Sequence, residues 1–201
     1  MAATTGLRER KKQRTRELIA EMARRLFVER GFDAVPVTEI ARDAEVSEKT
    51  VFNYFPTKED LVFWRLESFE DELLSAVRDR GADESILDAF GRFVMRRRGL
   101  LAAKDPESAE RLAAITRMIV SSPALQRRER EIFDRYTASL AGLIGGDVEA
   151  WVIANALMGV HRALVDYTRR RILEGARNPV LAREVSAEGK RALQRLAAGL
   201  G

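Results

Sequence analysis

The sequence has 201 residues, enough for one large domain or two smaller domains that each bury a core. It contains no cysteine and a single histidine, which excludes a disulfide framework, a thiol nucleophile and a thiolate zinc site. Charged residues make up 33% of the chain, but 35 basic residues nearly balance 31 acidic ones, so the net charge of +4 only weakly indicates nucleic-acid binding.

The N-terminal region concentrates positive charge. Between Arg8 and Arg16 there are six basic residues and one acidic residue. No apolar core follows this run, so it does not resemble a secretory signal, and no apolar run elsewhere approaches membrane-spanning length. We therefore expect a cytoplasmic protein with no membrane partner. A basic run is also typical of an ordinary solvated helix end, so its role depends on the segments that follow.

The first predicted element is an amphipathic helix that extends from the basic run to Arg30. Its apolar residues recur at helical spacing: Leu18, Ile19, Met22, Ala23, Leu26 and Phe27. Gly31 can adopt the left-handed conformation that ends a helix, and Phe32 is then placed to pack back on Phe27.

Two short helices should follow. One begins at Thr38, which we expect to cap it, and it buries Ile40, Ala41 and Ala44. Ser47 caps the next helix, residues 48–55, which Pro56 closes because proline disfavours helical geometry in the residue before it. The inward side of this helix carries Val51 and Phe55. Residues of about 37–55 therefore form a helix-turn-helix motif.

The outward side of residues 48–55 is polar. Thr50, Asn53 and Tyr54, with Lys49, occupy the exposed face and leading end of the helix that Ser47 caps. Hydroxyl, amide and ammonium groups can bind phosphates or base edges, so this face is typical of a recognition helix in a DNA major groove.

The remaining chain is predicted to be helical. Thr57 and Asp60 fit a capping box, which should begin a long helix. Later helices are separated by turn-forming stretches at residues 81–83, 104–106, 121–123, 145–147 and 175–179. We find no convincing alternating strand pattern. The fold class is therefore all-α, with a three-helix head at residues 1–56 and a helical body at residues 57–201.

Residues 15–65 resemble the TetR family of bacterial transcription regulators. The resemblance rests on these elements: Leu26-Phe27-x-x-x-Gly31-Phe32, Thr38-x-Ile40-Ala41, Val46-Ser47, Lys49 to Phe55, and Lys58-x-x-Leu61. It implies a DNA-binding transcriptional repressor that a small-molecule ligand releases from a palindromic operator in double-stranded DNA. It also implies a homodimer formed by the last two long helices and a partly apolar effector held among the middle helices.

The chain departs from the family pattern at two positions. Glu45 replaces the usual glycine of the turn, which costs about 1 kcal/mol if the backbone there is left-handed. Phe52 replaces a tyrosine whose hydroxyl reaches a phosphate in many members, so Tyr54 would have to supply that contact. The carried-over motif and the charge pattern together predict these DNA contacts: Arg14, Thr38, Ser47, Lys49, Thr50, Asn53, Tyr54 and Lys58.

The basic run gains importance because the motif itself is acidic. Residues 37–60 contain three basic and six acidic side chains. Affinity for DNA depends on neutralising phosphates, so positive charge must come from the run at residues 8–16, from Lys49 and from Lys58. A lysine in the first turn of a helix opposes the helix dipole, which suggests a phosphate partner for Lys58; an ordinary exposed lysine is the alternative.

The body offers candidate surfaces for dimerisation and ligand binding. Residues 151–165 are apolar on more than one face, and the last segment has a matching stripe at Leu193, Leu196, Ala197 and Leu200. Aromatic walls with a few polar anchors suggest an effector pocket at Phe90, Phe93, Met118, Phe133, Trp151, Asn155, Met158 and His161. Aromatic and methionine residues at helical spacing are core in most proteins, so an ordinary helical core is the favoured alternative for each residue taken alone.

Two other function classes, an enzyme and a nucleic-acid packaging protein, fit the sequence less well. An enzyme would need a phosphate-binding glycine loop, a serine elbow or a metal-ligand cluster, and the sequence contains none, so we expect no catalytic residue, metal or cofactor. A packaging protein that binds nucleic acid by charge alone is disfavoured by the nearly balanced composition.

Overall fold

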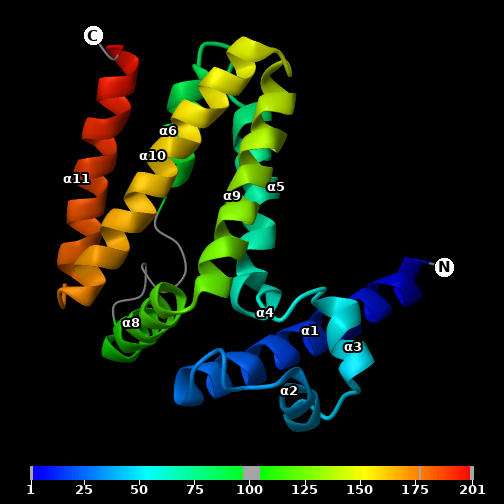
Figure 1. The fold of residues 1–201 in the computed structure, drawn as a ribbon. Coiled ribbons are helices and arrows are strands. Elements are labelled where there is room, and N and C mark those ends of the chain that lie inside the picture. Colours follow the sequence, from blue (N-terminus) through cyan, green and yellow to red (C-terminus); the bar gives the residue numbers. More distant parts are fainter. Residues whose placement is uncertain (1, 97–104, 177, 200–201) are drawn as a thin grey trace. The chain divides into compact units, whose positions relative to one another are not determined.

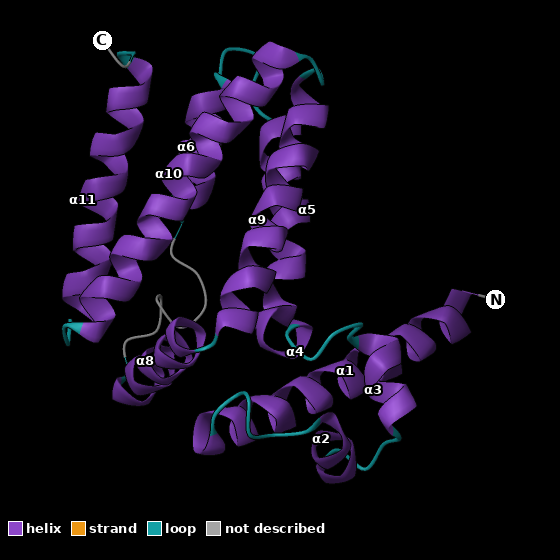
Figure 2. Cartoon of the chain, viewed as in Figure 1, coloured by secondary structure: helices purple, strands orange, loops and turns teal. Residues whose placement is uncertain are grey.

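The computed structural model describes residues 2–96, 105–176 and 178–199, and every regular element within these ranges is a helix (Figures 1 and 2). The all-α prediction is therefore confirmed. The chain divides into two compact units, which are described separately. The first unit comprises Met1–Glu67 and Met118–Gln126, and the second comprises Ser68–Arg117 and Arg127–Gly201.

The first unit contains α1 (Ala2–Arg30), α2 (Val37–Asp43), α3 (Glu48–Tyr54), α4 (Asp60–Phe63) and the 3₁₀ helix η1 (Trp64–Leu66). The end of α1 confirms its prediction. Gly31 has a φ of 86°, and its N–H donates to the Phe27 carbonyl at 2.9 Å. The rings of Phe27 and Phe32 then pack with centroids 5.0 Å apart, which secures the turn.

The core of this unit joins all four α-helices. Its largest fully buried side chains are Ile19, Phe27, Ile40, Phe55, Leu61 and Leu125. Leu18 was predicted on the same face of α1, but it is 46% exposed, so that part of the prediction was wrong. Leu61 lies beyond residue 56, so residues after the predicted boundary pack with the head. The domain boundary after residue 56 stays a prediction.

The start of α2 differs from its prediction. The helix α2 begins at Val37, directly after Pro36, and no side chain caps it, so Thr38 is not its N-cap. Proline readily takes the place before or at the first turn because it has no N–H to satisfy there.

The capping box at Thr57 forms as predicted. The Thr57 N–H donates to Asp60 Oδ2 at 2.9 Å, and the Asp60 N–H donates to Thr57 Oγ1 at 3.3 Å. However, the helix that follows has four residues, and η1 then leads into α5 (Glu67–Arg78). Leu61 and Phe63 are both buried. Residues two apart lie on nearly opposite sides of a straight helix, so packing favours a break over the long helix expected here.

The second unit contains most of α5 together with α6 (Ile86–Val94), α8 (Pro106–Ser121), α9 (Pro123–Ile144), α10 (Val148–Leu173) and α11 (Asn178–Ala197). Residues 118–126, at the junction of α8 and α9, belong to the first unit. The helix breaks at residues 81–83, 122, 145–147 and 175 confirm the predicted turns, and Lys104 lies outside the described residues.

Close packing joins helices that are distant in the sequence. A Cβ on Gly91 of α6 would meet Leu193 Cδ1 of α11 at 2.9 Å, and one on Gly189 of α11 would clash with the sulfur of Met95. Leu193, predicted on a stripe facing a second subunit, is half-buried and packs against α6 within its own subunit, and its place in a dimer interface stays a prediction. Leu200 lies outside the described residues.

The helix α10 is long and apolar enough to cross a membrane by length and composition alone, with 33% of its most apolar window buried. This differs from the expectation that no apolar run approaches such a length. One helix of this kind is weak evidence for a membrane span, because helices that pack inside globular proteins meet the same test.

Candidate nucleic-acid interface

The helix α3 is fixed at both ends by local contacts. The Thr50 N–H donates to Ser47 Oγ at 3.0 Å, which confirms Ser47 as the N-cap. The Ser47 and Thr50 hydroxyls also share a hydrogen bond of 2.8 Å. Val51 and Phe55 are buried beneath the helix, and the Phe55 N–H donates to the Val51 carbonyl at 2.9 Å. The outward side chains of α3 therefore rest on a rigid base.

The turn before α3 is strained at one residue. Glu45 has a φ of 54°, the only positive value at a non-glycine residue in the described chain. The turn closes because the Val46 N–H donates to the Ala41 carbonyl at 2.9 Å. Glu45 therefore adopts the left-handed backbone in which the family usually places glycine, at a cost of about 1 kcal/mol.

The structure places the predicted recognition residues on the outward side of α3. Lys49 and Asn53 are exposed, whereas Thr50 and Tyr54 are half-buried along one edge. On the opposite edge, Phe52 is 42% exposed. Phe52 was not among the predicted contacts, because it lacks the hydroxyl with which a tyrosine reaches a phosphate.

Lys58 has partners inside its own unit. It lies in the turn before α4, and its ammonium donates to the Phe32 carbonyl at 2.6 Å and lies 4.4 Å from the Phe32 ring centroid. Burial lowers the pKa of Lys58, while the carboxylates of Asp33 and Glu59 oppose that shift. Lys58 thus stabilises the turn after α1, and its contact with a phosphate stays a prediction.

The acidic charge of the motif is partly neutralised within the first unit. Glu39 forms ion pairs with Arg30 and Arg42, and Asp43 lies 3.8 Å from Arg25. Arg25 and Arg30 belong to α1 and were outside the segment whose charges were counted from the sequence. Exposed pairs of this kind add little stability, but they reduce the repulsion between the motif and a phosphate backbone.

The basic run forms part of α1. Arg8, Arg10, Lys11, Lys12 and Arg14 are exposed. The Arg16 guanidinium lies 5.3 Å from the ring centroid of Phe55, the C-cap of α3. This contact places the C-terminal end of the basic run beside the end of α3. Thr38, the remaining predicted contact, is exposed in the first turn of α2.

Three of the eight predicted pocket residues meet in the second unit. Phe93, Phe133 and His161 surround a cluster that includes Phe69 and Tyr136. The Phe69 ring centroid lies 5.1 Å from that of Phe93 and 4.9 Å from that of His161. The sequence analysis missed Phe69 and Tyr136, because no local signal shows that their helices meet.

The other five predicted pocket residues differ in burial. Phe90 and Met158 are fully buried, whereas Trp151 and Asn155 are exposed near the start of α10. The Asn155 amide donates to the Trp151 carbonyl at 2.8 Å. Met118 belongs to the first unit. A shared site for these five residues and the aromatic cluster stays a prediction.

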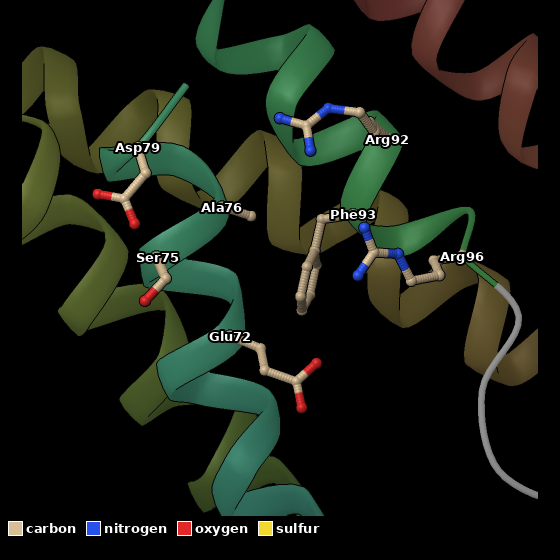
Figure 3. A pocket seen from close by; sticks show the side chains of 7 residues that line it. All are labelled: Glu72, Ser75, Ala76, Asp79, Arg92, Phe93 and Arg96. Carbon is tan, nitrogen blue, oxygen red and sulfur yellow. The ribbon is translucent and has the colours of Figure 1, made fainter. Parts of the chain in front are cut away.

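A groove of about 320 Å³ lies between α5 and α6 (Figure 3). Its lining residues are Glu72, Ser75, Ala76, Asp79, Arg92, Phe93 and Arg96. The Phe93 ring and the Glu72 carboxylate point into this space. The Arg92 guanidinium donates to both carboxylate oxygens of Glu84, each at 2.9 Å, and this bond lowers the pKa of Glu84. The groove is more charged than the predicted aromatic pocket and shares only Phe93 with it.

Comparison with known proteins identifies the type of domain. Residues 19–63 match the family described as bacterial regulatory proteins, tetR family. The chain is 28% identical over 150 residues to the HTH-type transcriptional regulator TcmR of Streptomyces glaucescens. The aligned residues cover 72% of this chain and 66% of that protein. It is 47% identical over 47 residues to the HTH-type transcriptional regulator LuxR of Vibrio harveyi, covering 23% of each.

Solved structures extend the likeness to the whole fold. A TetR-family transcriptional regulator from Syntrophomonas wolfei aligns with a TM-score of 0.60 at 20% identity, covering 94% of this chain and 98% of that one. At this level of identity the likeness concerns the fold, and it includes the helical body as well as the head.

Proposed function

We propose that this chain, a DNA-binding transcriptional regulator of the TetR family, is a homodimeric repressor that a small molecule releases from a palindromic operator. Its relatives are regulators and not enzymes. The observation that carries the proposal is the outward side of α3. Lys49 and Asn53 project from a helix that Ser47 caps and Val51 holds on the core. A capped helix with this face suits the major groove of duplex DNA.

Positive charge for phosphate binding comes from outside α3. The exposed residues Arg8 to Arg14 of α1 provide it, and Arg16 places this run beside the C-cap of α3. The ion pairs of Glu39 and Asp43 with α1 and Arg42 reduce the opposing negative charge. We expect the run to set affinity and the steepness of the salt dependence, and α3 to set sequence preference.

The proposed dimer interface is the outward side of α10. Val148 is 82% exposed and Val152 is 63% exposed, and the exposed Asn155, Gly159 and Ala163 continue this face at intervals of three or four residues. Small residues at its middle allow a second helix to approach closely. Burying this face against a second copy would remove apolar surface from water and match half-sites one helical turn apart.

The proposed effector site is the region of Phe93 in the second unit. Phe93 lines the groove between α5 and α6 and also contacts Phe69, the third residue of α5. A ligand that moves Phe93 would therefore act on the start of α5, which follows η1 directly. Differential binding to two arrangements of α5 would then change the affinity for DNA.

A binding assay with operator DNA tests the DNA-binding face. The full-length protein is used to select duplexes from a random-sequence library, and the affinity of the variant with Thr50, Asn53 and Tyr54 all changed to Ala is measured on the selected duplex. We expect at least a hundredfold loss, against no change for the control Arg130→Ala on α9. Unchanged binding by the triple variant would refute the assigned face, and binding without sequence preference would favour a packaging role.

Sedimentation tests the dimer. Neither Gly159 of α10 nor Gly142 of α9 has an atom within 4 Å of an added Cβ, so each subunit should tolerate arginine at either position. We expect Gly159→Arg to yield monomers and Gly142→Arg to remain dimeric. Dimers of both variants would exclude the α10 face as the interface.

A further inference from the structure

Phe52 is an apolar residue exposed within a polar surface. Phe52 is 42% exposed at one edge of α3, beside the exposed residues Lys49 and Asn53. Single exposed apolar residues are common on protein surfaces and need no special explanation. This one, however, lies on the face that the proposed function assigns to DNA, where each side chain has a phosphate, a sugar or a base edge as its neighbour.

The two edges of α3 differ chemically. Thr50 and Tyr54 are one turn apart and present hydroxyl groups on one edge, whereas Glu48 and Phe52 are one turn apart on the other. A carboxylate is repelled by phosphates, so the edge with Glu48 is unsuited to the DNA backbone. In the major groove a carboxylate can accept a hydrogen bond from the amino group of cytosine. The hydroxyl edge therefore suits the phosphates. A tyrosine in place of Phe52 would bond a phosphate through its hydroxyl, which lies beyond the ring, so the edge with Phe52 itself suits the bases.

The chemistry of phenylalanine limits which group on the base edges Phe52 can contact. Its ring has no hydrogen-bond donor or acceptor, so against a phosphate it would displace water without replacing the lost hydrogen bonds. The major groove offers one prominent apolar group, the C5 methyl of thymine. Contact between the ring and this methyl would bury apolar surface on both partners.

We propose that Phe52 determines specificity by packing on the C5 methyl of a thymine in each half-site of the operator. This inference rests on the proposed entry of α3 into the major groove. The backbone of Phe52 is held by Val51, which is buried, and by the cap at Ser47. The ring therefore meets the groove at a defined position along the helix, which a contact with a single base requires.

Replacing thymine by deoxyuridine tests the contact. The probe is a palindromic duplex that the full-length protein selects from a random-sequence library, and each thymine is replaced in turn. Deoxyuridine lacks only the C5 methyl and keeps the hydrogen-bonding pattern. We expect one position per half-site at which replacement weakens binding about fourfold, the equivalent of one buried methyl group. Replacement in both half-sites should weaken binding about fifteenfold, because the two contacts multiply.

Variants assign the effect to Phe52. We expect Phe52→Ala to bind thymine and deoxyuridine duplexes equally, and Phe52→Tyr, which keeps the ring, to retain the preference. Asn53→Ala should weaken binding but keep the thymine preference. Leu18→Ala, which shortens another exposed apolar residue of the same unit, should change neither affinity nor preference.

Each result decides between the two levels of the proposal. A selected site without thymine, a flat replacement scan, or a thymine preference that persists in Phe52→Ala would overturn the role of Phe52 while leaving DNA binding intact. Failure to select any sequence would overturn the proposed function, and the role of Phe52 would fall with it. Circular dichroism of Phe52→Ala shows whether the variant is folded, and Phe52→Tyr provides the readout if it is not.

Discussion

The two units are stabilised by contacts of different range. In the first unit, the decisive bonds around α3 join residues three to five positions apart, such as Ser47 with Thr50 and Val46 with Ala41. In the second unit, Glu70 binds Arg135 and Ser139, more than sixty positions away, and Arg169 binds Glu129 across forty. A site that depends on local bonds can be recognised in a sequence, whereas one that depends on distant contacts requires the folded chain.

This difference explains which functional surface is defined by the sequence. The DNA-binding face is built by caps and turns that short motifs specify. The proposed effector region lies where α5, α6, α9 and α10 meet, and its position follows from helix packing. If stability also depends on the range of the contacts, substitutions at distant contacts should lower the free energy of unfolding more than substitutions at local ones.

The largest effect is expected from a distant ion pair. The Arg169 and Glu129 side chains are mostly buried against each other between α9 and α10. Arg169→Met leaves a buried carboxylate without a partner and should lower the free energy of unfolding by about 3 kcal/mol in urea denaturation. Changing both residues to Met should restore most of the loss. By contrast, Arg24→Met removes a local surface pair with Glu21 and should cost about 0.5 kcal/mol or less.

A second test concerns close packing of α6 and α11. Gly189→Val places a side chain against Met95 and Leu164 and should lower the free energy of unfolding by about 2 kcal/mol. Gly142→Ala, in an open position of α9, should raise it by up to about 1 kcal/mol because alanine favours helix. Equal effects of the two substitutions in urea denaturation would contradict the tight approach of these helices.

The third test concerns the strained turn of the first unit. Glu45→Gly removes a side chain from a left-handed position, and it should raise the free energy of unfolding by about 0.5 to 1 kcal/mol. Glu45→Ala removes the same charge but keeps the strain, so it should not stabilise the protein. Equal stabilisation by both variants in thermal unfolding would indicate an effect of charge instead of backbone strain.

The smallest effect is expected from pH. The Arg171 guanidinium donates to Glu184 across α10 and α11 and lowers the pKa of Glu184 below its ordinary value of 4.5. A carboxyl whose pKa is lowered by folding stabilises the folded state above the unfolded pKa, and this contribution is lost as the pH falls through the folded pKa. Glu184→Gln should therefore weaken the dependence of stability on pH below 4.5, and an unaltered acid profile would exclude this bond as a contributor.

The sequence predicted those features that a few adjacent residues determine. Gly31 ends α1 and Ser47 caps α3, because each depends on the intrinsic geometry of one residue and its neighbours. The left-handed backbone at Glu45 was considered only through the resemblance, in which glycine is usual at that position. The exposure of Leu18 and the break after α4 were missed. Each of these depends on which helix packs on which side, and periodicity does not specify that.

The candidate sites divide in the same way. The outward positions of Lys49 and Asn53 follow from the helical period once Val51 and Phe55 are assigned to the core. The meeting of Phe93, Phe133 and His161 around Phe69 unites residues from α5, α6, α9 and α10. No spacing within any one of these helices indicates the others, so the aromatic cluster could not be assembled from the sequence.

The continuity of α1 gives its basic run an angular setting. Residues 2–30 form one uninterrupted helix, so the charged side chains at Arg8 to Arg14 are held in a constant rotational phase with the apolar face at Ile19 and Phe27. Each residue added to or removed from the helix between the two would turn the run by about 100° and shift it by about 1.5 Å. Insertion of a single alanine there would leave the net charge unchanged but point the cations in another direction.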